Sequence, residues 1–104
     1  MLPELHLLKG DLLAAIGADD GSGGAQAEPW YRLAFDRAGE LNARMTRLRA
    51  ATRLGRLHLA DGEAEAAART LEPIYATFTE GFATADLIEA RDLLAAVSGT
   101  GPGG

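Results

Sequence analysis

The feature that most constrains the fold is a recurrence of small residues between positions 51 and 75. Gly55 lies within an apolar stretch of helical periodicity, where glycine costs about 1 kcal/mol relative to alanine. A partner helix that lies too close for a side chain offsets such a cost. Gly62 can end the first helix with a positive φ angle, and Ala67 lets a second helix pack back on the first. The spacing therefore predicts an antiparallel helical hairpin.

A degenerate copy of this pattern precedes the hairpin. The offset between the copies is 45 residues for the glycines (10 to 55) and 40 for the alanines (27 to 67), with the excess in the loop around residues 19–24. The positions that carry the repeat are Gly10, Gly17, Ala27 and Tyr31 in the first copy, and Leu54, Gly55, Gly62, Ala67 and Leu71 in the second. The two copies predict two hairpins of similar packing.

The rest of the chain also has helical periodicity, and no useful β-alternation appears. We predict an all-α fold of about five helices in one domain over residues 1–97. The predicted helices span residues 3–16, 27–41, 45–60, 63–78 and 85–97, which give hairpin 1 (3–41), hairpin 2 (45–78) and a closing helix (85–97). Residues 18–26 are predicted to form a flexible loop, and the glycine-rich residues 98–104 a disordered tail.

Apolar periodicity also predicts which faces are buried. The predicted inner stripe of the first helix is Leu5, Leu8, Leu12, Leu13 and Ile16, and that of the closing helix is Leu87, Ala90, Leu94 and Val97. Proline constrains two of the helices, because it removes a backbone hydrogen bond from a helix interior. We expect Pro29 within the first turn of its helix, and a kink or break near Glu72 before Pro73.

Three blocks of sequence resemble the tetratricopeptide-repeat (TPR)-like C-terminal segment of large bacterial signalling ATPases. They are residues 4–13 (ELHLLKGDLL), residues 49–57 (RAATRLGRL) and the block that begins at Leu71-Glu72-Pro73-Ile74-Tyr75 and continues through Phe78-Thr79-Glu80-Gly81-Phe82 to Ala90. In those proteins an adenylate or guanylate cyclase, kinase or DNA-binding domain precedes an ATPase module and helical repeats. The resemblance implies a terminal helical-repeat region of a bacterial signalling or transcription regulator. Its implied partner is a protein, a peptide or the parent ATPase domain.

Composition and charge narrow the class of function. The net charge of −5 argues against non-specific binding to nucleic acid. The chain has no cysteine, no apolar run as long as a membrane span and no phosphate-binding loop. We expect a cytoplasmic, non-enzymatic protein with no cofactor, no metal site and no catalytic residue. His6 and His58 are distant in sequence and have no metal-site spacing, so we expect structural roles for both.

Five arginines and no acidic residue occur between positions 43 and 59, whereas both flanks are acidic. By analogy with TPR hairpins, this helix lines a groove that binds carboxylates or acidic peptides. The predicted partner-binding residues are Arg49, Thr52, Arg53, Arg56 and Leu59, with Glu4, Leu7 and Asp11 from the first hairpin. The alternative for these arginines is a solvated face that pairs with local acids.

Two further expectations concern what the domain contacts. A different class of function is a sensor that binds a small anionic ligand or peptide in the groove between helices, next to Arg49 or Arg56. A repeat array cut from its neighbours also exposes an end that a neighbour would cover. We therefore expect a homodimer or weak self-association through the first helix, where Leu7 and Leu8 are adjacent.

Overall fold

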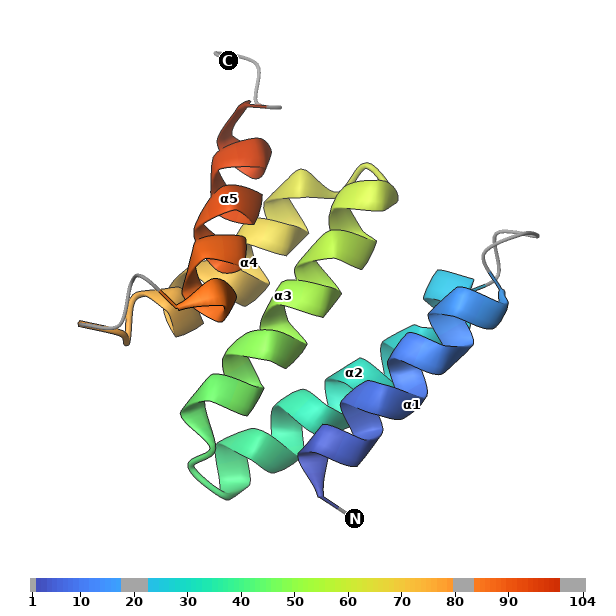
Figure 1. The fold of residues 1–104 in the computed structure, drawn as a ribbon. Helices are drawn as coiled ribbons and strands as arrows, with labels where there is room; N and C mark the ends of the chain where they lie inside the picture. The colour runs from blue at the N-terminus through green and yellow to red at the C-terminus, as the bar shows by residue number, and fades with distance from the viewer. Residues whose placement is uncertain (1, 18–22, 80–83, 100–104) are drawn as a thin grey trace. The chain divides into compact units, whose positions relative to one another are not determined.

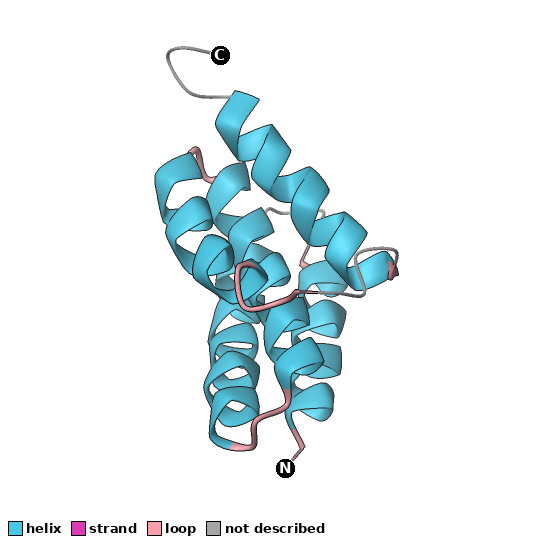
Figure 2. Ribbon diagram, turned by 90° about the vertical axis from the view of Figure 1, so that its left-hand side faces the viewer, coloured by secondary structure: helices cyan, strands magenta, loops and turns pink. Residues whose placement is uncertain are grey.

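The computed structural model describes residues 2–17, 23–79 and 84–99, and these residues form five helices and no strand (Figures 1 and 2). The helices are α1 (Pro3–Ile16), α2 (Gly23–Glu40), α3 (Arg44–Ala60), α4 (Ala64–Tyr75) and α5 (Ala85–Gly99). The predicted all-α class is therefore confirmed. The predicted bounds of the first helix agree with α1, and those of the third differ by one residue at its start.

The chain divides into two compact units, Met1–Ala50 and Ala51–Gly104. The boundary falls inside α3, whose first half belongs to the first unit and whose second half belongs to the second. The predicted organisation, with residues 1–97 in one domain and hairpins at 3–41 and 45–78, stays a prediction. Each unit has its own core and is described separately.

In the first unit, α1 and α2 lie side by side and pack against each other (Figure 1). Gly10 is a point of close contact, because a Cβ atom built on it would lie 2.5 Å from Cε1 of the Tyr31 ring. The buried apolar side chains of this unit are Leu7, Ala27, Tyr31, Ala34, Ala38, Leu48 and Ala50. The glycine on α1 thus lets the Tyr31 ring of α2 lie against the backbone of α1.

The buried face of α1 is not the predicted one. The buried residues of the helix are Pro3, His6, Leu7 and Gly10, whereas Leu5, Leu8, Leu12 and Ile16 are exposed. The physical reason is the glycine at position 10, since only that side of the helix admits the Tyr31 ring. The predicted inner stripe is therefore an outer surface, apart from the half-buried Leu13.

The second unit contains Gly55, Gly62 and Ala67, the small residues that predict the second hairpin. A Cβ atom on Gly55 would lie 3.8 Å from the carbonyl oxygen of Ala67 on α4, but only 2.9 Å from Cδ2 of Leu93 on α5. Gly55 and Ala67 are neighbours as predicted, but α4 leaves room for a methyl group at position 55, and the atom that lies too close belongs to Leu93 of α5. Leu93 is buried and Leu94 is half-buried, so the predicted inner stripe of the closing helix is wrong at that position.

Two helices end in the same hydrogen-bonded motif. At the end of α2, Asn42 has φ of 57° and donates its N–H to the Gly39 carbonyl, while Ala43 donates to Ala38. At the end of α3, Gly62 has φ of 79° and donates to Leu59, while Glu63 donates to His58. Both are Schellman motifs, in which a left-handed residue satisfies the last carbonyls of a helix.

The positive φ angle predicted for Gly62 is thus confirmed, and Asn42 has the same role at the end of α2. Three residues connect each pair of helices (41–43 and 61–63). Gly17 is different, because it follows α1 with φ of −89° and does not use the left-handed region. The structural counterpart of Gly62 is Asn42 rather than Gly17.

Other helix bounds also differ from the prediction. Because α2 begins at Gly23, Pro29 lies beyond the first turn, and residues 23–26 are helical rather than loop. Pro29 is exposed and leaves only the Ala25 carbonyl without its helical donor, a cost that the packing of buried Ala27 and Tyr31 offsets. The fourth helix continues through Pro73 and ends at Tyr75.

The first two residues of the predicted tail are helical. Helix α5 extends to Gly99, two residues into the predicted tail. Residues 18–22 of the predicted loop, residues 100–104 of the tail and Phe82 lie outside the described residues.

Candidate functional surface on the first helix

The most unusual surface of the described residues is the outer face of α1. Leu5, Leu8, Leu12 and Ile16 are between 48% and 74% exposed, and we call these four residues the α1 stripe. They share one side of the helix because they are spaced three or four residues apart. Leu2, directly before α1, is 62% exposed and continues the same run of apolar residues. Single exposed leucines are common in proteins, but a continuous row on one helix indicates a contact surface.

A shallow apolar groove of about 300 Å³ lies beside the stripe. Its walls are three leucines of the α1 stripe, Lys9 and Trp30 of α2. The ammonium group of Lys9 lies 5.7 Å from the centre of the Trp30 ring, close enough for a cation–π interaction. The His6 ring also lies near Trp30, with the two ring centres 5.9 Å apart. The groove therefore has mostly apolar walls and one positively charged group, the ammonium of Lys9.

Two hydrogen bonds hold α1 so that the stripe faces outward. The Thr46 hydroxyl of α3 donates to Oε1 of Glu4 at 3.0 Å. The Tyr31 hydroxyl of α2 donates to Oδ1 of Asp11 at 2.6 Å. Both acidic residues lie on the opposite side of the stripe from Lys9, given their positions along the helix. The stripe is thus bordered by acidic residues along one edge and by Lys9 along the other.

His6 lies beneath this surface rather than in it. It is 6% exposed, and its Nδ1 atom has no hydrogen-bond partner among the described residues. Burial lowers the pKa of His6 below its ordinary value of 6.5, and the positive charge of Arg37 lowers it further. A neutral histidine packed on Trp30 acts as part of the core. His58 is half-buried near the end of α3.

The residues predicted to bind a partner have several different environments. Glu4, Leu7, Asp11 and Arg49 belong to the first unit, and Thr52, Arg53, Arg56 and Leu59 to the second. Leu7 and Thr52 are only 5% and 3% exposed, so neither offers a side chain to a partner from solution. Glu4 and Asp11 are engaged by Thr46 and Tyr31. Arg49, Arg53 and Leu59 are half-buried, and both arginines have interactions within the chain.

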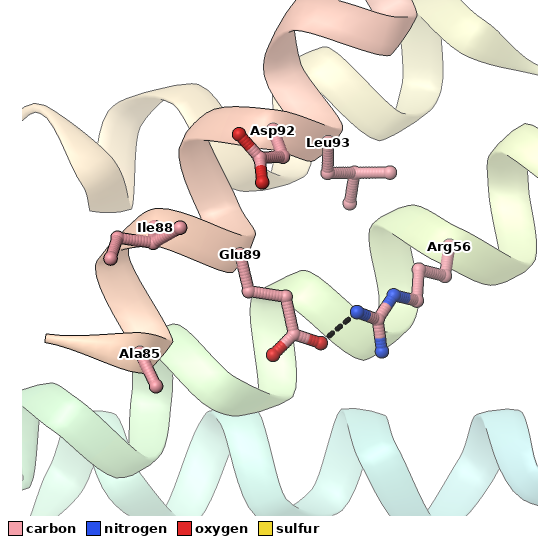
Figure 3. A pocket seen from close by; sticks show the side chains of 6 residues that line it. All are labelled: Arg56, Ala85, Ile88, Glu89, Asp92 and Leu93. Carbon is pink, nitrogen blue, oxygen red and sulfur yellow. Dashed lines mark ion pairs between the residues drawn. The ribbon is translucent and has the colours of Figure 1, made fainter.

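Arg56 is the exposed member of the predicted arginine row. Its guanidinium forms an ion pair with Glu89 of α5, and the two side chains are 53% and 40% exposed (Figure 3). The pair lies at the edge of an open pocket of about 510 Å³. The residues that line it are Arg56, Ala85, Ile88, Glu89, Asp92 and Leu93. Two carboxylates against one guanidinium give this pocket a negative balance, which does not favour an anionic ligand.

Arg47, which the predicted arginine row left out, is the arginine with the clearest structural role. Its guanidinium lies 4.5 Å from the centre of the Phe35 ring, and a Cβ atom on Gly39 would lie 3.2 Å from its Nε atom. Its side chain therefore passes over α2 at a glycine and stacks on an aromatic ring. The sequence signal for this contact was the glycine at position 39, four residues after Phe35.

Within residues 2–17, 23–79 and 84–99, no group of three His, Asp or Glu side chains could hold a metal ion. No helix in the described part of the chain is long and apolar enough to cross a membrane. Comparisons with protein-family models, with curated proteins and with solved structures found no match.

Proposed function

We propose that this chain is a non-enzymatic module for protein–protein contact and that the α1 stripe is its contact surface. The observation that carries the proposal is the outward position of four large apolar side chains on one face of a helix whose other face is buried. Five of the eight large apolar side chains exposed in the described residues lie between Leu2 and Ile16. A partner that covers them gains roughly 25 cal/mol for each Å² of apolar surface removed from water.

The bordering groups suit recognition rather than chemistry. Lys9 and the acidic edge can orient a partner, while the groove next to Trp30 can accept an apolar side chain. We further propose, from the resemblance to repeat segments of bacterial signalling ATPases, that the contact serves a signalling or transcription regulator.

Site-specific photo-crosslinking in cells that make the protein tests the contact function. A photoreactive amino acid replaces Leu8 in one variant and Leu41 in the control, because both leucines are 56% exposed and Leu41 lies outside the α1 stripe. We expect a discrete protein adduct from position 8 and none from position 41. Equal labelling from both positions, or no adduct from position 8, would reject the α1 stripe as a contact surface.

A further inference from the structure

We propose that the α1 stripe binds the α1 stripe of a second copy of this chain with the two helices parallel, an inference that rests on the proposed contact function. The first reason is the register of the apolar residues. Leu5 and Leu12 are seven residues apart, with Leu8 between them, so they fit positions a, d and a of a coiled-coil heptad. The next d position is Ala15, which is also exposed, and Ile16 falls at the following e position on the edge of the seam. Two such seams pack against each other by knobs-into-holes contacts.

The second reason is the charge on each border of the seam. In this register Glu4 occupies a g position and Lys9 an e position, on opposite edges of the stripe. When two identical helices are parallel, the g edge of one faces the e edge of the other. Glu4 of each copy then meets Lys9 of the other copy, so the two-fold symmetric dimer contains two such pairs. An antiparallel arrangement would instead place like edges together.

The structure holds both charged groups where such a pair needs them. Oε1 of Glu4 accepts the hydrogen bond from Thr46, which leaves Oε2 on an exposed residue at the acidic edge. Lys9 is exposed and lies over the Trp30 ring at the other edge. Trp30 also lines the groove beside Leu5 and Leu8, so it adds apolar surface where the second copy approaches.

The size of the contact indicates a weak and reversible dimer. α1 has 14 residues, which is two heptads, and its seam has one alanine among four core positions. Such an interface is below the standard size for stable complexes. We expect a dissociation constant on the order of 10 to 100 µM. Replacement of Leu8 by glutamine removes an apolar contact from both copies and should weaken dimerisation at least tenfold, by roughly the burial of one leucine side chain.

Cysteine cross-linking measures the orientation, because the chain contains no native cysteine. In a parallel dimer every seam residue faces its own counterpart, so Leu5→Cys and Leu12→Cys should each form a disulfide-linked dimer. The two sites are about 10 Å apart along the helix, which exceeds the separation that a disulfide can span. An antiparallel pair can therefore cross-link efficiently at no more than one of them. Leu41→Cys, at an equally exposed leucine, is the control and should stay monomeric.

Charge reversal provides a second and independent readout. Lys9→Glu places like charges across the interface and should weaken the dimer roughly three- to tenfold. Glu4→Lys should do the same. A mixture of the two variants should form heterodimers, because each edge then meets the opposite charge. This recovery separates an interface effect from the loss of the bond between Glu4 and Thr46, which mixing cannot restore.

Sedimentation velocity of the purified chain, up to roughly 0.5 mM, decides the matter, since that concentration lies well above the expected dissociation constant. A dimer with cross-links at both positions 5 and 12 supports the proposal. A monomer at the highest concentration, a cross-link at only one position, or no recovery on mixing would overturn it. If the photoreactive residue at position 8 then captures a different protein, the contact function stands while self-association fails.

Discussion

The ring of Tyr31 lies against the backbone of α1 at Gly10, where a Cβ atom would be 2.5 Å from Cε1 and 2.7 Å from Cδ1 of the ring. The ring is 4% exposed, and its hydroxyl donates to Asp11 at 2.6 Å. It is therefore fixed by packing and by a hydrogen bond to a charged group. This contact determines which face of α1 is buried, and hence which face is presented to solvent.

We predict that Gly10→Ala lowers the free energy of unfolding by about 1–3 kcal/mol, because a rigid ring must move. Gly55→Ala is the matched comparison. Its Cβ atom would meet the terminal methyl group of Leu93, which can rotate, and alanine improves helix propensity by about 1 kcal/mol. We expect Gly55→Ala to change stability by less than about 1 kcal/mol. Urea unfolding monitored by circular dichroism measures both.

A double-mutant cycle checks the cause of the Gly10 effect. Tyr31→Leu removes the ring and leaves a side chain of the kind found at Leu71, its counterpart in the second copy of the repeat. In that background Gly10→Ala should cost clearly less than in the natural sequence. The same cost in both backgrounds would show that the ring is not what excludes a side chain at position 10.

The predicted all-α class and the five helices are confirmed in the described residues, because the apolar residues recur at helical spacing and a glycine or asparagine follows each of the first three helices. The sequence could not select the buried face of α1. Leucines occur on both sides of that helix, so apolar periodicity alone favoured the longer row at Leu5, Leu8 and Leu12. The deciding signal was Gly10, through the same close-approach argument that correctly placed Gly55 against Ala67.

The sequence predicts self-association through the first helix, but it does not predict the exposure of the α1 stripe, for a related reason. A row of leucines on a helix is usually core, and only the packing of α2 on the other face of α1 shows that this row is exposed. The arginines of α3 can be recognised in the sequence because their charge is evident there. Their acidic partners cannot be recognised in the same way, because the pair of Arg56 with Glu89 joins residues that are far apart in the chain.

The Schellman motifs predict opposite effects at two equivalent positions. Asn42 has φ of 57°, a conformation that glycine adopts more readily, so Asn42→Gly should raise stability by about 0.5–1 kcal/mol. Gly62 has φ of 79° with no atom within 4 Å of a Cβ position, so Gly62→Ala should cost about 1 kcal/mol from backbone strain alone.

Thermal unfolding followed at the helical signal measures both changes. Gly62→Asn is the control and should cost less than Gly62→Ala, because asparagine tolerates left-handed backbone. Equal losses for alanine and asparagine would argue against the assigned role of the backbone angle.

His6 predicts a dependence of stability on pH. Its pKa in the fold lies below the ordinary value of 6.5 because of burial and the charge of Arg37. The unfolded chain therefore binds a proton more readily than the folded chain. The stabilising contribution of His6 is complete above pH 6.5. It is lost as the pH falls from 6.5 through the lower pKa that His6 has in the folded state.

Comparison with His6→Gln isolates this effect from the titration of carboxylates. The difference in unfolding free energy between the natural sequence and the variant should shrink as the pH falls from 7.5 to about 5, through the ordinary histidine pKa. A difference that stays constant over this range would mean that His6 does not change its protonation between the folded and unfolded states.

Two arginines of α3 should differ in what they contribute to stability. Arg47 stacks on Phe35 at 4.5 Å and crosses α2 at Gly39, and its Nε atom is buried. Arg47→Ala should therefore cost about 1–2 kcal/mol, from the lost cation–π contact and the lost packing of its methylene groups. Arg56 is 53% exposed and paired with Glu89 at the surface, so Arg56→Ala should cost less than about 1 kcal/mol.

Salt provides the discriminating measurement for this pair of variants. High ionic strength screens exposed charges, so it should remove most of the small Arg56→Ala effect and leave most of the Arg47→Ala effect. Arg47→Lys tests the geometry, because lysine keeps the charge but lacks the planar group that stacks on the ring. If Arg47→Lys were as stable as the natural sequence, the charge of Arg47 and not its stacking on Phe35 would hold α3 to α2.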